Sequence, residues 1–294
     1  MENKNGAKIT FFYLLSLFGL AFVAICSGVI LFQVINKLIP DVVGTYSGRY
    51  STDALRFAIS AVIVASPVYY WMASLINKSL KKQELEIDSQ LRKWMTYVII
   101  FISAVVIIIS LIGVINNYLN GDLTSKIGLK LLITMLISGT VLSYYLYDIK
   151  RIDFAKSKVI KLYFMGSLVF ILFSLIFGFG IADSPAQVRK MKHDSNILND
   201  FNNIKYGIEE YNRNNNVLPK ELEEANHFVK VEGNIVDYDY KVISDNEYEL
   251  CADFEANNKN DLSLENDYLN KEWPHETGHQ CFSENISLIQ KEIK

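Results

Sequence analysis

Before Asp183, the apolar residues of this chain run in long stretches that contain almost no charge. A run of about 18 or more apolar residues is long enough to cross the roughly 30 Å hydrocarbon core of a bilayer. Helices of soluble proteins are rarely so long and apolar on every face. The stretches are Ile9–Asn36, Ala54–Ile76, Trp94–Tyr118, Ile127–Tyr147 and Val159–Ile181. They predict an α-helical bundle of five transmembrane helices within residues 1–183.

After Asp183 the pattern becomes periodic. Between Pro185 and Arg213, apolar residues recur every three, four or seven positions, which predicts one amphipathic helix. Pro219 can open a short helix that ends near Glu224. Alternating runs separated by turn residues predict strands at His227–Val231, Ile235–Ile243 and Glu247–Phe254. With a polar loop over Ala256–Lys271, residues 184–294 read as a small α+β domain with an antiparallel sheet.

The charges divide at the same boundary. Residues 1–183 contain 17 Lys and Arg against 10 Asp and Glu, whereas the remaining residues contain 12 against 22. A phosphate backbone is bound by clustered Lys and Arg. The acidic second half therefore argues against nucleic acid as a partner.

The loop charges predict the orientation in the membrane, since Lys and Arg accumulate in cytoplasmic loops. Twelve of them fall in the N-terminus and in the second and fourth loops, against three, Lys37, Arg49 and Lys126, in the first and third loops. We therefore expect a multi-pass protein of the bacterial inner (cell) membrane, in contact with the lipid bilayer. Its N-terminus would be cytoplasmic and its C-terminal domain extracytoplasmic.

The spans carry little chemistry of their own. No His, Asp or Glu lies in the middle of any span, and such intramembrane groups usually mark proton and ion paths. All four histidines lie beyond residue 190, which excludes a histidine-ligated haem between the helices. We expect no cofactor, and a small-solute transporter with an accessory domain remains a weaker alternative.

Four short segments of the membrane half stand out: Phe11–Leu17 (FFYLLSL), Ile35–Asp41 (INKLIPD), Ala54–Ala58 (ALRFA) and Arg92–Trp94 (RKW). On these segments, residues of about 10 to 150 resemble a bacterial membrane domain of unknown function, number 5671. The resemblance implies a fold but no activity.

The C-terminal domain contains Tyr211, then Asn216-Val217-Leu218-Pro219, then Leu222. This motif resembles one in the head of type IV pilins and pseudopilins. The resemblance implies a membrane helix running into an amphipathic helix, followed by a small antiparallel sheet and a region closed by cysteines. In this chain the membrane helix is the fifth of five, with no prepilin peptidase site. Assembly into a fibre is therefore not expected.

Cys251 and Cys281 are the two cysteines of the C-terminal domain. An even pair in a non-cytosolic domain predicts a disulfide. Closing a loop of this size stabilises a fold by on the order of 3–4 kcal/mol in chain-entropy treatments. The alternation along Tyr248–Ala252 places Cys251 on the face opposite Tyr248 and Leu250. Metal ligation by the two thiols is the alternative.

The segment His275-Glu276-Thr277-Gly278-His279 matches the zincin motif, in which two histidines one helical turn apart hold zinc and the glutamate activates water. Pro274 precedes the motif and Gly278 interrupts it, and glycine is costly inside a helix. We therefore expect a surface loop beside the disulfide, with no metal and no catalytic residue.

These observations predict a non-enzymatic envelope protein whose helices anchor an extracytoplasmic domain that binds other envelope proteins or a surface ligand. The alternative from a different class is a zinc-dependent membrane metallopeptidase using His275, Glu276 and His279.

Overall fold

A computed structural model describes residues 6–39, 50–81, 90–151, 158–225, 238–259 and 268–286. The chain forms two compact units, Met1–Ala182 and Asp183–Lys294.

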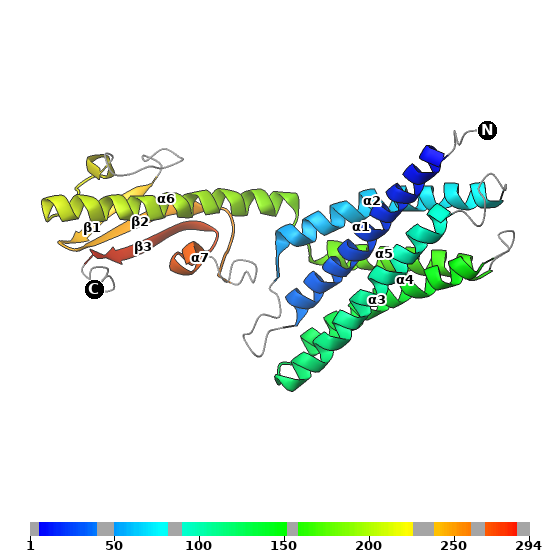
Figure 1. Cartoon of the computed structure of the whole chain (residues 1–294). Helices are drawn as coiled ribbons and strands as arrows, with labels where there is room; N and C mark the ends of the chain where they lie inside the picture. The colour runs from blue at the N-terminus through cyan, green and yellow to red at the C-terminus, as the bar shows by residue number, and fades with distance from the viewer. Residues whose placement is uncertain are drawn as a thin grey trace. The chain divides into compact units, whose positions relative to one another are not determined.

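The first unit consists of five long helices (Figure 1). They are α1 Gly6–Leu38, α2 Thr52–Lys81, α3 Gln90–Leu119, α4 Ser125–Lys150 and α5 Lys158–Ile181. Each predicted apolar stretch falls inside one of them, and all five are long and apolar enough to cross a membrane. The five-helix expectation is therefore confirmed for the described residues.

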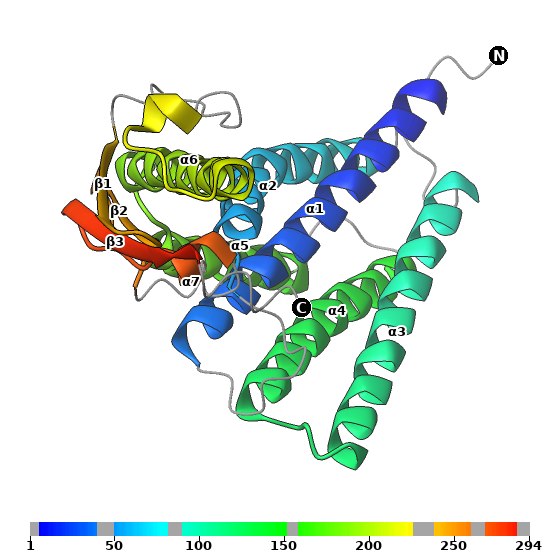
Figure 2. The ribbon, with the colours of Figure 1, turned by 90° about the vertical axis from the view of Figure 1, so that its left-hand side faces the viewer.

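Side chains of α1, α2 and α5 form the main core of this unit. Ile30 of α1 and Leu55 and Val62 of α2 have no exposed surface, and Ile171 of α5 packs with them. Figure 2 shows α1 crossing α2, and α3 lying beside α4. A Cβ on Gly178 of α5 would lie 2.8 Å from Cγ2 of Ile30, so this glycine lets α5 approach α1 closely.

The second unit is built on α6, Pro185–Asn215. Ser184 caps its first turn by accepting a hydrogen bond from the backbone N–H of Gln187, and Pro185 follows at the first helical position. Asn216 ends the helix in the left-handed conformation, with φ of 57°. Asparagine tolerates this conformation better than most residues.

Three antiparallel strands form one sheet in the order β1–β2–β3. They are β1 Asp239–Ser244, β2 Glu247–Phe254 and β3 Gly278–Asn285. The short helices η1 Leu222–Ala225 and α7 Tyr268–Glu272 complete the unit. Figure 1 shows α6 lying along the sheet.

The core of the second unit lies between α6 and one face of the sheet. Phe201, Ile204 and Ile208 of α6 are fully buried against Leu250 of β2 and against Trp273. Four aromatic rings surround Phe201 with centroids 5.4 to 6.0 Å away, each nearly perpendicular to it. This edge-to-face geometry is favourable for aromatic pairs.

The predicted elements of this unit differ from the observed ones in three respects. Strand β3 was not predicted, α7 lies within a segment predicted to be loop, and the short helix starts at Leu222 rather than Pro219. The predicted strand His227–Val231, and Ile235 to Asp237 of the next, lie outside the described residues. The described part of that second strand corresponds to β1.

Candidate functional site

One face of the sheet carries five potential ligand side chains, which we call the outer-face cluster: Asp239, Cys251, Asp253, His279 and Cys281. Across the three strands, Asp239 pairs with Cys251 and Cys251 with Cys281, while Asp253 pairs with His279. Directly paired residues point to the same face of a sheet, as do residues two apart on one strand. The backbone register therefore brings all five together, opposite the face that packs on α6.

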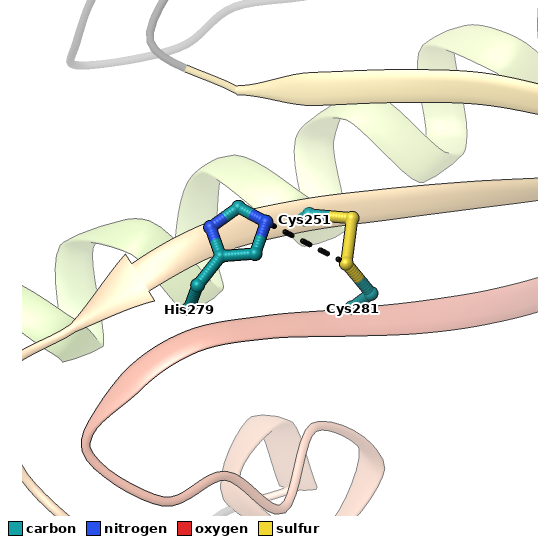
Figure 3. A group of neighbouring side chains, drawn as sticks. All are labelled: Cys251, His279 and Cys281. Atoms are coloured by element: carbon teal, nitrogen blue, oxygen red, sulfur yellow. Dashed lines mark hydrogen bonds between the residues drawn. A yellow bond between two sulfur atoms is a disulfide. The ribbon is translucent and has the colours of Figure 1, made fainter.

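The cysteine pair is the centre of this cluster. The Cα atoms of Cys251 and Cys281 are 4.1 Å apart and their sulfurs form a disulfide, as the sequence predicts (Figure 3). Cys251 is buried, whereas Cys281 is exposed. The disulfide thus joins two strands that are already paired through hydrogen bonds, and one of its two cysteines is exposed to solvent.

His279 connects the disulfide to the carboxylates. Its Nδ1 atom lies 3.2 Å from Oδ1 of Asp253, and its Nε2 atom lies 3.7 Å from both Oδ2 of Asp239 and Sγ of Cys281. The imidazole is half exposed and both carboxylates are largely exposed. Figure 3 shows the ring turned toward the Cys281 sulfur.

The zincin-like motif does not form a helix. His275 and Glu276 lie in irregular chain, and Gly278 and His279 begin strand β3. Gly278 has φ of 104°, which a residue with a side chain rarely adopts. His275 and His279 are therefore not one turn apart on a helix, which is the geometry by which zincins hold zinc.

The surface-loop expectation is wrong for His275, which is 1% exposed. Its ring stacks on Phe254 at 3.9 Å, its Nδ1 atom lies 3.0 Å from the carbonyl of Trp273, and its Nε2 atom lies 3.6 Å from Asp194. His275 is thus a packed core residue, while His279 is on the outer face and Glu276 forms an exposed ion pair with Lys259.

A second polar group lies in the helical unit. Arg92 of α3 donates to the backbone carbonyl and the carboxylate of Asp148 at the end of α4, at 2.7 and 3.2 Å. Arg151 also lies 3.2 Å from the Asp148 carboxylate and donates to Oδ1 of Asn77 on α2. Both arginine side chains are nearly buried. The group therefore links α2, α3 and α4 at the end of the bundle that the sequence assigns to the cytoplasm.

A cavity of about 50 Å³ adjoins this group. Its polar lining includes Tyr13, Tyr69, Tyr144 and Tyr145, together with Asp148. Pockets that bind drug-sized ligands have volumes of about 300–1,000 Å³. This cavity has room for water-sized molecules and not for an organic solute.

The sequence predicts the cysteine pair, but it predicts neither the whole outer-face cluster nor the Arg92–Asp148–Arg151 group. The three-residue spacing of Asp148 and Arg151 is visible in the sequence and predicts a pair on one helical face. The link from Arg92 to Asp148 spans 56 residues and depends on how α3 packs on α4. The outer-face cluster depends on strand β3, which the sequence does not predict.

Comparison with known proteins informs the helical unit alone. Neither the curated proteins nor the solved structures contain a match to this chain. Residues 10–145 match the family described as Domain of unknown function (DUF5671), which agrees with the resemblance seen in the sequence of the membrane half.

Proposed function

We propose that this protein is a multi-pass protein of the bacterial cell membrane that presents its C-terminal unit outside the cytoplasm as a binding domain for other envelope proteins. The observation that carries the proposal is that the unit Asp183–Lys294 has a hydrophobic core of its own, formed by residues between Ile197 and Ile286. A unit with its own core is a separate domain, and here it follows five apolar helices.

The surface of the helical unit supports insertion in lipid. Large apolar side chains on α3, α4 and α5 remain exposed, among them Phe101, Ile112, Leu132, Leu162 and Ile176. Apolar surface of this extent is costly in water and is the normal surface of a helix in hydrocarbon. The bilayer is accordingly the partner we propose for this unit.

The distribution of basic residues supports an extracytoplasmic C-terminus. The twelve-to-three bias of Lys and Arg places the N-terminus and the Arg92–Asp148–Arg151 group on the cytoplasmic side. Five crossings then lead to the opposite side after Ile181, and the second unit begins at Asp183. A disulfide between Cys251 and Cys281 suits that compartment.

The charge of the second unit indicates the chemistry of its partner. Residues 184–294 have a net charge of −10, which favours a protein with a basic surface, because complementary charges speed and orient encounter. The order of a long helix, a short helix and antiparallel strands agrees with the resemblance to pilin heads. That resemblance supports contact between envelope proteins as the class of function.

Reporter fusions test the orientation. Alkaline phosphatase, which is active only after export, should be active when fused after residue 294 and inactive when fused after residue 85. Green fluorescent protein fused at the same two positions should give the reverse pattern. Phosphatase activity at residue 85 together with fluorescence at residue 294 would overturn the proposed topology.

Site-specific photo-cross-linking tests the binding role. A photoreactive amino acid at Tyr206 or Tyr268, both exposed on the second unit, should link the full-length protein to a discrete envelope protein in living cells. The matched control is Trp94, an equally exposed aromatic residue at the predicted cytoplasmic end of α3. Labelling of lipid alone at all three positions would contradict the proposal.

A further inference from the structure

We propose that the outer-face cluster is a redox-controlled metal site. When the Cys251–Cys281 disulfide is reduced, the two thiolates and His279 bind one borderline-soft divalent cation such as Zn²⁺. This inference goes beyond the proposed binding role, since it concerns the sheet itself and no protein partner.

The donor atoms of these three residues already lie within 4.8 Å of one another. In a tetrahedral zinc site with Zn–S of about 2.3 Å and Zn–N of about 2.0 Å, a sulfur and a nitrogen ligand are about 3.5 Å apart. The observed distance from Nε2 of His279 to Sγ of Cys281 is 3.7 Å. Two thiolate ligands lie about 3.8 Å apart in the same geometry. Once the disulfide is broken, the sulfurs reach this separation through side-chain rotation.

The carboxylates complete the arrangement around His279. Metal-bound histidines commonly donate the N–H of the other ring nitrogen to a carboxylate, which fixes the ring. Here Nδ1 lies 3.2 Å from Asp253, so Nε2 is the atom left facing the sulfurs. Asp239, whose Oδ2 atom is 3.7 Å from Nε2, supplies the fourth ligand.

The ligand set determines which ion fits. Two thiolates, one imidazole and one carboxylate favour zinc and similar ions, whereas Ca²⁺ and Mg²⁺ prefer oxygen ligands alone. All four ligands stand on hydrogen-bonded strands in fixed register. A rigid scaffold of this kind holds ligands in place at little entropic cost.

The electrons and protons of the reduction are accounted for when a dithiol is the reductant. The dithiol gives two electrons and two protons and becomes a disulfide, while the Cys251–Cys281 bond breaks and yields two thiols. Zn²⁺ then displaces one proton from each thiol, so two protons enter the solvent. Reoxidation reverses both steps and releases the metal.

Cobalt titration of the full-length protein in detergent tests the site. After reduction with a phosphine, which competes weakly for metal, Co²⁺ alone is added as the probe. We expect one Co²⁺ per chain, with a thiolate-to-cobalt charge-transfer band and the visible bands of a tetrahedral ion, both lost on addition of Zn²⁺. The oxidised protein should show neither band.

Variants separate this site from other thiols and histidines. His279→Ala, at an exposed position, should abolish the tetrahedral bands, and Asp253→Ala should weaken binding roughly 10- to 100-fold. The double variant Cys251→Ser/Cys281→Ser retains Cys26 and should show no charge-transfer band. Glu276→Gln, in the zincin-like motif, and His193→Ala, on the exposed side of α6, are matched controls that should change nothing.

Three outcomes would overturn the proposal: no stoichiometric Co²⁺ on the reduced protein, equal binding by the oxidised protein, or unchanged bands in His279→Ala. Because His279 is half exposed and outside the core, its replacement keeps the test valid even where the double cysteine variant fails to fold.

Discussion

Asp194 is a carboxylate on α6 whose side chain is only 4% exposed. Its two oxygens accept hydrogen bonds from the backbone N–H groups of Glu255 and Ala256, at 2.9 and 2.7 Å, and one of them lies 3.6 Å from His275. The chain that leaves β2 is therefore held on α6 by one side chain. Buried N–H groups that lose such an acceptor keep the full cost of their desolvation.

Asp194→Ala should accordingly destabilise the second unit by about 2–3 kcal/mol. The full-length protein with Trp71→Phe and Trp94→Phe leaves the buried Trp273 as its only tryptophan, so urea unfolding of this unit can be followed by fluorescence. The control Glu223→Ala, at an exposed carboxylate on η1, should shift the midpoint little. Equal shifts in the two variants would show that Asp194 does not hold the chain in this way.

Lys205 of α6 is the second charged residue on which the core depends. Its ammonium group contacts the carboxylates of Glu272 and Glu284, and all three side chains are mostly buried. Burial alone would lower the pKa of Lys205, but the hydrogen bonds to the two carboxylates outweigh it and raise the pKa. Nearby, burial raises the pKa of the Glu209 carboxyl, against the attraction of Lys205.

Lys205→Met keeps most of the side-chain volume and removes the charge, and it should destabilise the second unit by on the order of 2 kcal/mol at pH 7. Since the pKa of Lys205 is higher in the folded state, its contribution is complete below the unfolded value of about 10.4 and is lost as the pH rises through the folded value. In the Trp273 background, the difference in urea midpoint between Lys205→Met and its parent should therefore be the same at pH 6 and at pH 9. The two midpoints should converge only at higher pH. Convergence at neutral pH would contradict this explanation.

At the scale of elements, regular patterns were predictable and long-range pairings were not. The five helices of the first unit follow from continuous apolar runs and the amphipathic helix from local periodicity, and each predicted segment lies within an observed helix. The sequence does not predict strand β3, because Gly278-His279-Gln280-Cys281 lacks the alternation of apolar and polar residues typical of a strand and overlaps a motif that is helical in zincins. The positive φ of Gly278 lies at the first residue of the strand.

The close approach between α5 and α1 also escaped prediction, because a single glycine in an apolar span looks like any other. Gly178→Val should destabilise the helical unit, since the new Cβ would lie 2.8 Å from Ile30 and 3.3 Å from Ile59, both buried. Overpacking of this kind costs about 1–3 kcal/mol.

Gly180→Val is the matched control on the same helix, because no packed neighbour among the described residues lies within 4 Å of a Cβ at that position. The temperature at which half of the detergent-solubilised protein stays monodisperse on size-exclusion chromatography should fall for Gly178→Val and not for Gly180→Val. A similar fall in both would mean that valine acts through the helix backbone and not through packing.

At the scale of the whole molecule, the two units differ in how they reach stability. The helical unit leaves large apolar side chains exposed and has a small-residue contact inside it, as expected for a protein whose surroundings are apolar. The second unit packs a core of apolar residues between α6 and the sheet and carries the net negative charge of the chain. These surfaces suit water around the second unit and, as we propose, lipid around the first.

This difference predicts that residues 184–294 fold without the five helices. The core side chains, the Asp194 and Lys205 interactions and the disulfide all lie inside this segment. Exported to an oxidising compartment, the fragment should be soluble and monomeric and unfold in one cooperative transition. A disulfide closing a loop of 30 residues contributes on the order of 3–4 kcal/mol to the free energy of unfolding. The fragment with Cys251→Ser and Cys281→Ser should lose this contribution and unfold at a lower urea concentration. Amide protection in α6 and β2 would verify the fold, and an unprotected, aggregating fragment would show that the second unit needs the first.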